Sequence, residues 1–399
     1  MGGLSLPAAA WRSRAGLDRL CDVLGAGAAR FVGGAVRDTL LGIEVADIDL
    51  ATTLPPEDVL DRLRAARIKA VPTGLAHGTI TAVLPDGPVE VTTLRRDVST
   101  DGRHATVAFT QAWQEDAARR DFTINALYAD PATAEIFDYF GGVDDLAARR
   151  VRFIGDPLQR IAEDHLRILR FFRFQARFGE SVDGAGLAAC TARANDLMAL
   201  SRERIAAELL KLLVAERAVP TVALMIDHGI FRPVLPEIAS AARLAQLAAR
   251  ESRGGIPAQP IRRLAALLPA NEAVAEEIGA RLKLSKLDRR RLVSATCPAG
   301  DDPAQAIAYA LGTELAIDRL LLSERPVGDA QAITGWQPPR LPVSGGALVA
   351  RGVRKGPEVA KLLRAIEIQW VREGFPDFPR LDAIVEAQLD QWRRVSINA

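Results

Sequence analysis

Two glycines followed by two aspartates are the residues of this sequence with the clearest potential for chemistry. Gly33 and Gly34 end an apolar run, and Asp47 and Asp49 follow shortly after. A strand that ends in two glycines and leads into a helix exposes backbone N–H groups that a phosphate can approach. Carboxylates at i and i+2 of an extended strand leave from one face, and such a pair suits Mg²⁺ together with substrate phosphates. The arrangement predicts metal-assisted nucleotidyl transfer.

Each half of this arrangement also has an ordinary explanation. A glycine pair is commonly only a tight turn, and an Asp-x-Asp pair is commonly a loop or a helix cap. Here a short helix is predicted over 35–41, it should stop at Gly42, and a strand is predicted over 48–52. These elements form one compact unit that directs the glycines and the carboxylates to one place, which favours the functional interpretation.

Two later segments are rich in groups that bind phosphates and bases. Residues 119–126 are RRDFTINA and residues 163–174 are EDHLRILRFFRF. Guanidinium groups match phosphate oxygens, while carboxylate and amide groups bond hydroxyls. The second segment predicts one helix over 163–178 that ends at Gly179. The alternatives are a surface helix entry capped by Asp121 and an exposed salt-bridge ladder along the second segment.

Composition places milder limits on the protein. With 399 residues, 49% hydrophobic and 25% charged, the chain is typical of a soluble globular protein of two or three domains. A net charge of +1 says little about nucleic-acid binding, but arginines crowd between 119 and 177 and could create a local positive field. Three scattered cysteines indicate a reducing compartment. Without a signal peptide or a long apolar stretch, a cytoplasmic location and no membrane contact are expected.

The character of the chain changes near residue 155. Before it, short β-prone runs over 68–72, 79–84 and 89–94 alternate with helical segments, and after it the apolar spacing is helical. We therefore expect an α+β protein with an α/β segment over 1–155 followed by helical segments over 156–255 and 256–399.

With these motifs in this order, the chain resembles the bacterial class II nucleotidyltransferases of the tRNA CCA-adding enzyme and poly(A) polymerase family. Strong similarity covers about residues 28–215 and resumes over 342–370, where Ala347 and Ala360 depart from the common pattern. The resemblance also rests on Asp138, Gly141-Gly142 and Asp145-Leu146. It implies a polymerase-β-like nucleotidyltransferase α/β head followed by an all-α neck, body and tail.

The resemblance also implies roles for individual residues. Asp47 and Asp49 would hold Mg²⁺ ions, and Glu90 would be a third carboxylate near them. The nucleotide would be bound by Gly33, Gly34, Arg37, Arg120, Asp121, Asp164, Arg167, Arg170 and Arg173. Within this set Arg120 would contact phosphate and Asp121 the ribose. Asp164 and Arg167 would contact the incoming base, because a carboxylate accepts from the amino group that C and A share.

The implied activity is addition of C and A to the 3′ end of tRNA from CTP and ATP, with pyrophosphate released. The protein would grip the acceptor arm of tRNA. The alternatives within this chemistry are a poly(A) polymerase and an enzyme that adds only C or only A. A catalytically silent RNA-binding protein is the non-enzyme alternative, and the sequence leaves the oligomeric state open.

Overall fold

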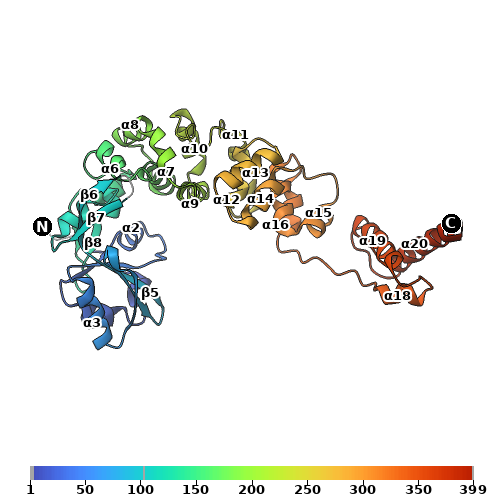
Figure 1. The fold of residues 1–399 in the computed structure, drawn as a ribbon, viewed down its shortest axis with the longest axis horizontal. Coiled ribbons are helices and arrows are strands. Elements are labelled where there is room, and N and C mark those ends of the chain that lie inside the picture. Colours follow the sequence, from blue (N-terminus) through green and yellow to red (C-terminus); the bar gives the residue numbers. More distant parts are fainter. Residues whose placement is uncertain (1–3, 102–103, 398–399) are drawn as a thin grey trace. The chain divides into compact units, whose positions relative to one another are not determined.

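The computed structural model describes residues 4–101 and 104–397. The chain packs as two compact units, one ending at Pro236 and the other beginning at Glu237. Within the described residues, all strands belong to the first unit, and the second is helical (Figure 1). The predicted α+β class is therefore confirmed. The predicted division at residues 155 and 255 stays a proposal about how function is distributed.

The first unit contains the strands and the helices that surround them. The strands are β1 (Ala29–Val32), β2 (Asp49–Thr52), β3 (Lys69–Gly74), β4 (Thr79–Leu84), β5 (Gly87–Thr93), β6 (Arg95–Asp101), β7 (His104–Phe109), β8 (Leu127–Ala129) and β9 (Ile136–Asp138). The α-helices are α1 (Leu17–Leu24), α2 (Gly34–Leu40), α3 (Pro56–Ala65), α4 (Trp113–Ala118), α5 (Gly142–Ala147), α6 (Pro157–Glu163), α7 (Arg167–Phe178), α8 (Gly184–Ala192), α9 (Arg202–Leu213) and α10 (Ala218–Asp227). Short 3₁₀ helices are η1 (Ala10–Ser13), η2 (Leu75–His77), η3 (Thr123–Asn125) and η4 (Ala194–Ala199).

The second unit is built from helices connected by loops. They are α11 (Ala242–Gly254), α12 (Pro260–Leu267), α13 (Glu272–Arg281), α14 (Lys286–Thr296), α15 (Ala304–Leu311), α16 (Thr313–Leu322), α17 (Val327–Ile333), α18 (Gly345–Ala350), α19 (Pro357–Arg372) and α20 (Arg380–Ile397). Helices α18 to α20 share an apolar cluster that includes Leu348, Trp370 and Leu389. Each of these helices buries its apolar face against the others, as amphipathic helices do.

The main sheet brings two acidic strands together. Its order is β3-β4-β5-β2-β1-β8-β9, and within it β2 and β5 pair in parallel while the other neighbours are antiparallel. The parallel register places Asp49 opposite Glu90. Ile48 and Leu50 are buried, and so are Ala51 and Thr52, because β2 is an inner strand of the sheet rather than a half-buried one. The predicted carboxylate pair therefore lies where β2 begins, beside β5.

The segment predicted as one helix over 163–178 is wrong in its first turn. Helix α6 ends at Glu163, Asp164 has extended backbone (φ −149°, ψ 106°), and α7 begins at Arg167. The Asp164 carboxylate accepts a hydrogen bond from the backbone N–H of Leu166. Aspartate side chains compete in this way with the helical hydrogen bonds of the backbone. The break separates Asp164 from the helix that contains the arginines.

An aromatic cluster joins α7 to the sheet region. The ring of Phe122 lies 5.0 Å from that of Phe153 and 5.2 Å from that of Phe174, and Phe153 stacks on Phe171 at 5.5 Å. Such ring pairs contribute beyond their buried area. The RRDFTINA segment and α7 are therefore held in one packed core.

The motif at 138–146 turns out to be structural. Asp138 accepts hydrogen bonds from the backbone N–H groups of Gly142 and Val143, which begin α5. The buried Asp145 accepts from Thr123 and pairs with Arg150 and Arg152. This motif ties α5 to η3 of the RRDFTINA segment.

Gly142→Ala should destabilise the protein by about 1–3 kcal/mol, the usual cost of overpacking in a dense core. A Cβ at position 142 would lie only 2.3 Å from the carbonyl oxygen of Thr123. The control is Gly184→Ala, since a Cβ there meets nothing within 4 Å. Denaturant unfolding of both variants tests this, and equal stabilities for the two would contradict the close approach.

Candidate functional site

The glycine pair lies between two guanidinium groups. Gly33 has a φ of +65°, which favours glycine. A Cβ added to Gly33 would lie 3.5 Å from Nη1 of Arg120, and one added to Gly34 would lie 3.8 Å from Nη2 of Arg37. Because neither glycine has a side chain, the backbone of each lies close to one guanidinium group. This arrangement suits a phosphate chain, since guanidinium forks match phosphate oxygens.

Three acidic side chains beside the glycine pair have no protein partner. Within the described residues, Asp47, Asp49 and Glu90 make no hydrogen bond or ion pair with their side chains. Burial first, and then the negative charge of Glu90 and Asp47, raise the pKa of Asp49 to about 6, although Arg120 acts in the opposite direction. Uncompensated negative charge at one end of a strand is what a divalent cation would neutralise.

The same carboxylates do not form a closed metal cage. No three Asp, Glu, His or Cys side chains are grouped closely enough to bind a metal by themselves among the residues that the structure describes. The oxygens at Asp47 and Asp49 nevertheless have the chemistry that hard cations prefer. A cation held here would need further oxygen ligands from a substrate.

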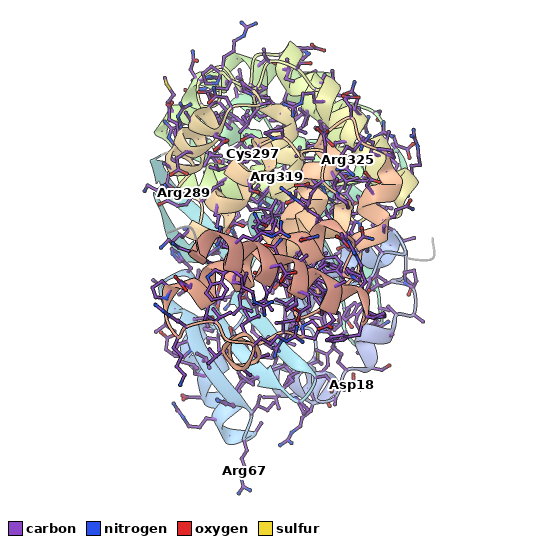
Figure 2. The ribbon with its side chains drawn as sticks, turned by 90° about the vertical axis from the view of Figure 1, so that its right-hand side faces the viewer. Asp18, Arg67, Arg289, Cys297, Arg319 and Arg325 are labelled. Carbon is purple, nitrogen blue, oxygen red and sulfur yellow. The ribbon has the colours of Figure 1, made fainter. Side chains whose placement is uncertain are left out.

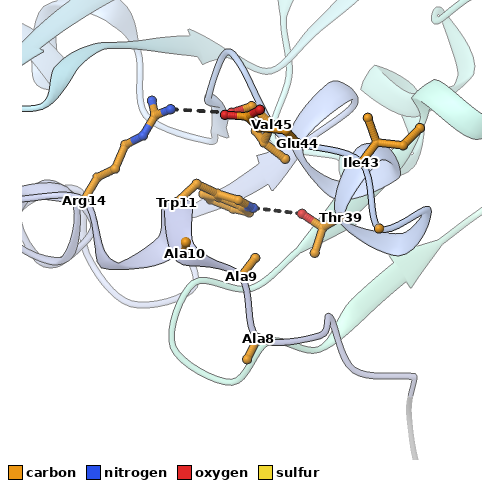
Figure 3. Close-up of a pocket in the computed structure, with 10 residues that line it drawn as sticks. Ala8, Ala9, Ala10, Trp11, Arg14, Thr39, Ile43, Glu44 and Val45 are labelled. Atoms are coloured by element: carbon orange, nitrogen blue, oxygen red, sulfur yellow. Dashed lines mark hydrogen bonds between the residues drawn. The ribbon is translucent and has the colours of Figure 1, made fainter.

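The loop that leads into Asp47 is anchored by the N-terminal segment (Figure 3). The indole Nε1 of Trp11 donates to Oγ1 of Thr39 at 2.8 Å. The guanidinium of Arg14 donates to the carbonyl groups of Val45 and Ala46 at 3.5 and 3.4 Å. A cavity of about 590 Å³ lies beside these contacts, lined by residues of η1, α2 and the loop. The contacts restrict the backbone that precedes the acidic pair.

Arg37 is fixed from two sides. It is 6% exposed, it donates to Asp38 at 2.7 Å, and it donates to the side-chain oxygen of Asn125. Asn125 in turn donates to Asp121 at 2.9 Å. Such charge-assisted bonds hold the guanidinium in one orientation beside Gly34.

Asp121 lies at the centre of this network rather than at a surface cap. One of its oxygens accepts from the backbone N–H of Phe122 and from Asn125, and the other accepts from Arg170 at 2.7 Å. Burial alone would raise the pKa of Asp121, but Arg170 and the hydrogen bonds outweigh it and lower the pKa. The carboxylate therefore connects the RRDFTINA segment to α7.

A second buried carboxylate, Asp116, orients Arg120. Asp116 is 1% exposed, pairs with Arg119 and Arg120, and accepts from the Tyr128 hydroxyl at 2.7 Å. Burial opposes ionisation, but Arg120, Arg119 and the Tyr128 bond lower the pKa of Asp116 to about 2. Asp116 thus stays charged and holds Arg120 beside Gly33.

The two residues predicted to contact the base lie on either side of the helix break. Both oxygens of Asp164 accept from Arg204 of α9, at 3.0 and 3.1 Å. Arg167 pairs with Glu163 at 2.6 Å and donates to the carbonyl groups of Arg160 and Arg119. Asp164 remains about a third exposed, whereas Arg167 is largely enclosed.

The predicted site residues are thus brought together in one unit, but nearly all of the arginines already have acidic partners. Arg170 pairs with Asp121 and Arg173 with Glu208 at 2.8 Å. Sequence reasoning missed the partners Asp116, Tyr128, Arg204 and Glu208. Asp116 precedes Arg119 and Arg120 by three and four residues, a spacing that could have indicated it. Tyr128, Arg204 and Glu208 contact residues far from them in the sequence, so no short-range pattern indicates them.

Arginines of the second unit are also largely engaged with their own unit. Arg289, Arg319 and Arg325 are three arginines of this unit (Figure 2). Arg289 pairs with Glu276, Arg319 donates to the Ser294 carbonyl at 3.0 Å, and Arg325 pairs with Asp329 at 2.6 Å. These contacts stabilise the helices and assign no function.

Comparison with known proteins decides the family. Residues 29–152 match the poly A polymerase head domain, and residues 182–242 match the probable RNA and SrmB-binding site of polymerase A. The chain is 36% identical over 368 residues to the mouse CCA tRNA nucleotidyltransferase 1, mitochondrial, covering 87% of this chain and 83% of the relative. This chain belongs to the CCA-adding tRNA nucleotidyltransferase family. It is also 30% identical over 377 residues to the CCA-adding enzyme of Latilactobacillus sakei, with 88% and 91% covered.

Solved structures agree with this assignment. The CCA-adding enzyme of Bacillus stearothermophilus in complex with CTP matches with a TM-score of 0.72 and 27% identity, over 96% of this chain and 98% of that one. A Thermotoga maritima CCA-adding enzyme shares the fold, with a TM-score of 0.68. Nucleotidyltransferases of this fold use a divalent metal ion, in accord with the acidic trio. Among the described residues, no helix has the length and apolarity of a bilayer span.

Asp116→Asn should lower the free energy of unfolding by about 2 kcal/mol at pH 7, because a pKa lowered from 3.8 to about 2 corresponds to that stabilisation. The stabilisation is present above pH 4 and disappears as the pH falls toward 2. The difference between wild type and variant should therefore shrink over this range in denaturant unfolding at several pH values. A difference that stays constant from pH 7 to pH 3 would contradict the charged network.

Proposed function

We propose that this chain adds C and A to the 3′ end of tRNA, using CTP and ATP and releasing pyrophosphate. The observation that supports it best is the juxtaposition of the glycine pair, flanked by Arg37 and Arg120, with the unpartnered acids Asp47 and Asp49. The glycine pair with its two guanidinium groups suits a triphosphate, and the two carboxylates suit a metal ion. The family names of its relatives agree with this reaction.

The proposed roles follow from this geometry. Asp47 and Asp49 would hold Mg²⁺, with Glu90 nearby, and bound Mg²⁺ would supply activation of the RNA 3′-hydroxyl and neutralisation of the leaving pyrophosphate. Arg37 and Arg120, together with the backbone at Gly33 and Gly34, bind and orient the triphosphate. Asp121 acts mainly by fixing Asn125 and Arg170, since it is buried and both of its oxygens already accept hydrogen bonds, whereas Asp164 remains about a third exposed.

Nucleotide choice is proposed to depend on Asp164 and Arg167. The carboxylate accepts from the amino group that cytosine and adenine share, and the guanidinium donates to a ring nitrogen or carbonyl. Arg204 holds both Asp164 oxygens and so orients the acceptor. Arg170 and Arg173 would border the nucleotide. Protein groups would then replace a nucleic-acid template.

The predicted location and domain roles stay proposals. A cytoplasmic location is proposed, while the mouse and human relatives carry a mitochondrial name. The segment 1–155 is proposed as the catalytic head, 156–255 as the neck with the base-contacting residues, and 256–399 as an RNA-binding body and tail.

Three tRNA transcripts test the function directly. They end before the CCA sequence, after C, and after CC, and each is incubated with CTP or ATP alone before its 3′ end is sequenced. We expect C on the first two and A on the third. A run of A on every transcript would indicate a poly(A) polymerase, addition of one base only would indicate a specialist, and no addition would indicate a silent RNA-binding protein.

Asp47→Ala and Asp49→Ala should each abolish nucleotide addition, because each removes a carboxylate that binds the metal ion. The Kd for tRNA should change little, since neither carboxylate is proposed to contact RNA. Asp58→Ala, which removes an exposed acid on α3, is the control and should retain activity. Turnover by either site variant within tenfold of wild type would refute the metal assignment.

Arg120→Ala should raise the KM for CTP and for ATP by similar factors, about tenfold to a hundredfold, because it removes a charge-assisted contact to a phosphate that both share. Arg119→Ala is the matched control, since Arg119 pairs with the same Asp116 but does not flank Gly33. Steady-state kinetics with both nucleotides checks this. A defect confined to one nucleotide would contradict a phosphate role.

A further inference from the structure

A second cavity of the first unit extends from Asp47 toward the ends of α7 and α9. Its volume is about 640 Å³. The residues that line it include Arg37, Asp47, Arg173, Phe174, Arg177, Phe178, Lys211, Val214, Ala215 and Glu216. The lining therefore contains a proposed metal ligand and, besides Arg37 and Arg173, two cations that the nucleotide-binding set does not include, Arg177 and Lys211.

Arg177 and Lys211 are the cations of this cavity whose charge is least compensated. Arg177 is half exposed, and within the described residues its one ion pair is a long contact of 3.4 Å to Asp38, which Arg37 already engages at 2.7 Å. Lys211 is exposed and makes no hydrogen bond or ion pair within the part of the chain that the structure describes. By contrast, Arg173 is paired closely with Glu208.

The helices place these two cations at one end of the cleft. On α9, Arg204, Glu208 and Lys211 lie at i, i+4 and i+7, so they share a face. Arg204 pairs with Asp164, and Glu208 pairs with Arg173. Lys211 lies further along the same face of the helix. On α7, Arg177 lies ten residues after Arg167, about 15 Å along the helix axis. The two cations thus lie far from the groups proposed to contact the base.

The proposed reaction needs two polyanions beside Asp47, the nucleoside triphosphate and the RNA strand that it extends. The glycine pair, Arg37 and Arg120 are proposed to bind the triphosphate. No residue of that set is assigned to the phosphates of the RNA strand. Exposed, weakly paired cations in a cavity that reaches Asp47 are suited to such phosphates.

We propose that Arg177 and Lys211 form a subsite for the backbone phosphates of the RNA strand whose 3′-hydroxyl is extended, a proposal that rests on the proposed function. The rings of Phe174 and Phe178 form the buried floor of the subsite, and the Arg177 guanidinium lies 4.9 Å from the centre of the Phe178 ring. The rings are too buried to stack on bases, so the subsite binds phosphate without selecting sequence.

The test measures binding and turnover separately. The full-length double variant Arg177→Ala/Lys211→Ala is titrated with a tRNA transcript that ends after CC and carries a 3′-deoxy terminus, at several salt concentrations. We expect the Kd to rise roughly tenfold and the slope of log K against log salt to decrease by about 0.7 for each lost contact to a single strand. The KM values for CTP and ATP should stay unchanged.

Two control variants separate this role from a structural one. Arg177→Lys keeps the positive charge and should restore most of the affinity lost in Arg177→Ala. Arg64→Ala, which removes an exposed arginine of α3, should leave both the Kd and the slope unchanged. Melting temperatures of all variants show whether the fold is retained.

Two results would overturn the subsite. One is an unchanged Kd and salt slope in the double variant, and the other is a raised KM for CTP and ATP with unchanged RNA binding, which would assign the cations to the incoming nucleotide. Extension of an unmodified transcript by the wild-type protein is measured in parallel. Its absence would instead refute the proposed function, because the binding measurement needs no turnover.

Discussion

The buried carboxylate of Asp121 is the constraint on which the rest of the site depends. It connects the backbone of Phe122, the amide of Asn125 and the guanidinium of Arg170, and through Asn125 it reaches Arg37. Breaking a buried ion pair on one side leaves an uncompensated charge, which costs about 3–5 kcal/mol. The sheet that presents the acids and glycines and the helix that presents the arginines are therefore fixed relative to one another.

The arginines of α7 are also paired with carboxylates of other segments. Three of them have close partners from three different segments: Glu163 for Arg167, Asp121 for Arg170 and Glu208 for Arg173. The pair of Arg177 with Asp38 is longer, and Arg177 is half exposed. Exposed pairs of this kind would contribute little, but pairs that are largely enclosed hold their side chains in place. A guanidinium that is held in place can present its remaining N–H groups to a ligand without losing further side-chain entropy on binding. The ion pairs therefore hold the arginines in an orientation that favours ligand binding, and they do not prevent it.

Local chemistry explains what could be predicted from the sequence. The glycine pair at the start of α2 and the strand next to it depend on neighbours in the chain, and the structure has both close to where they were predicted. Asp47, however, lies in the loop before β2 and not in the strand, and the strand is buried without alternation. The break at Asp164 was missed because a single side-chain bond to the backbone outweighed a strong helical pattern. The partners Arg204 and Tyr128 could not be predicted, since they contact Asp164 and Asp116 only when the fold brings distant segments together.

The most direct test of this account is the nucleotide preference of Asp164→Ala. Values of kcat/KM for CTP, ATP, UTP and GTP are measured on one tRNA, beside a melting curve. Asp156→Ala, which removes the N-cap of α6, controls for local loss of stability. The account predicts that discrimination against UTP and GTP falls by about 1–3 kcal/mol in Asp164→Ala and not in the control. Unchanged ratios with a lowered melting temperature would show that Asp164 only stabilises the fold and that the protein does not select nucleotides through this carboxylate.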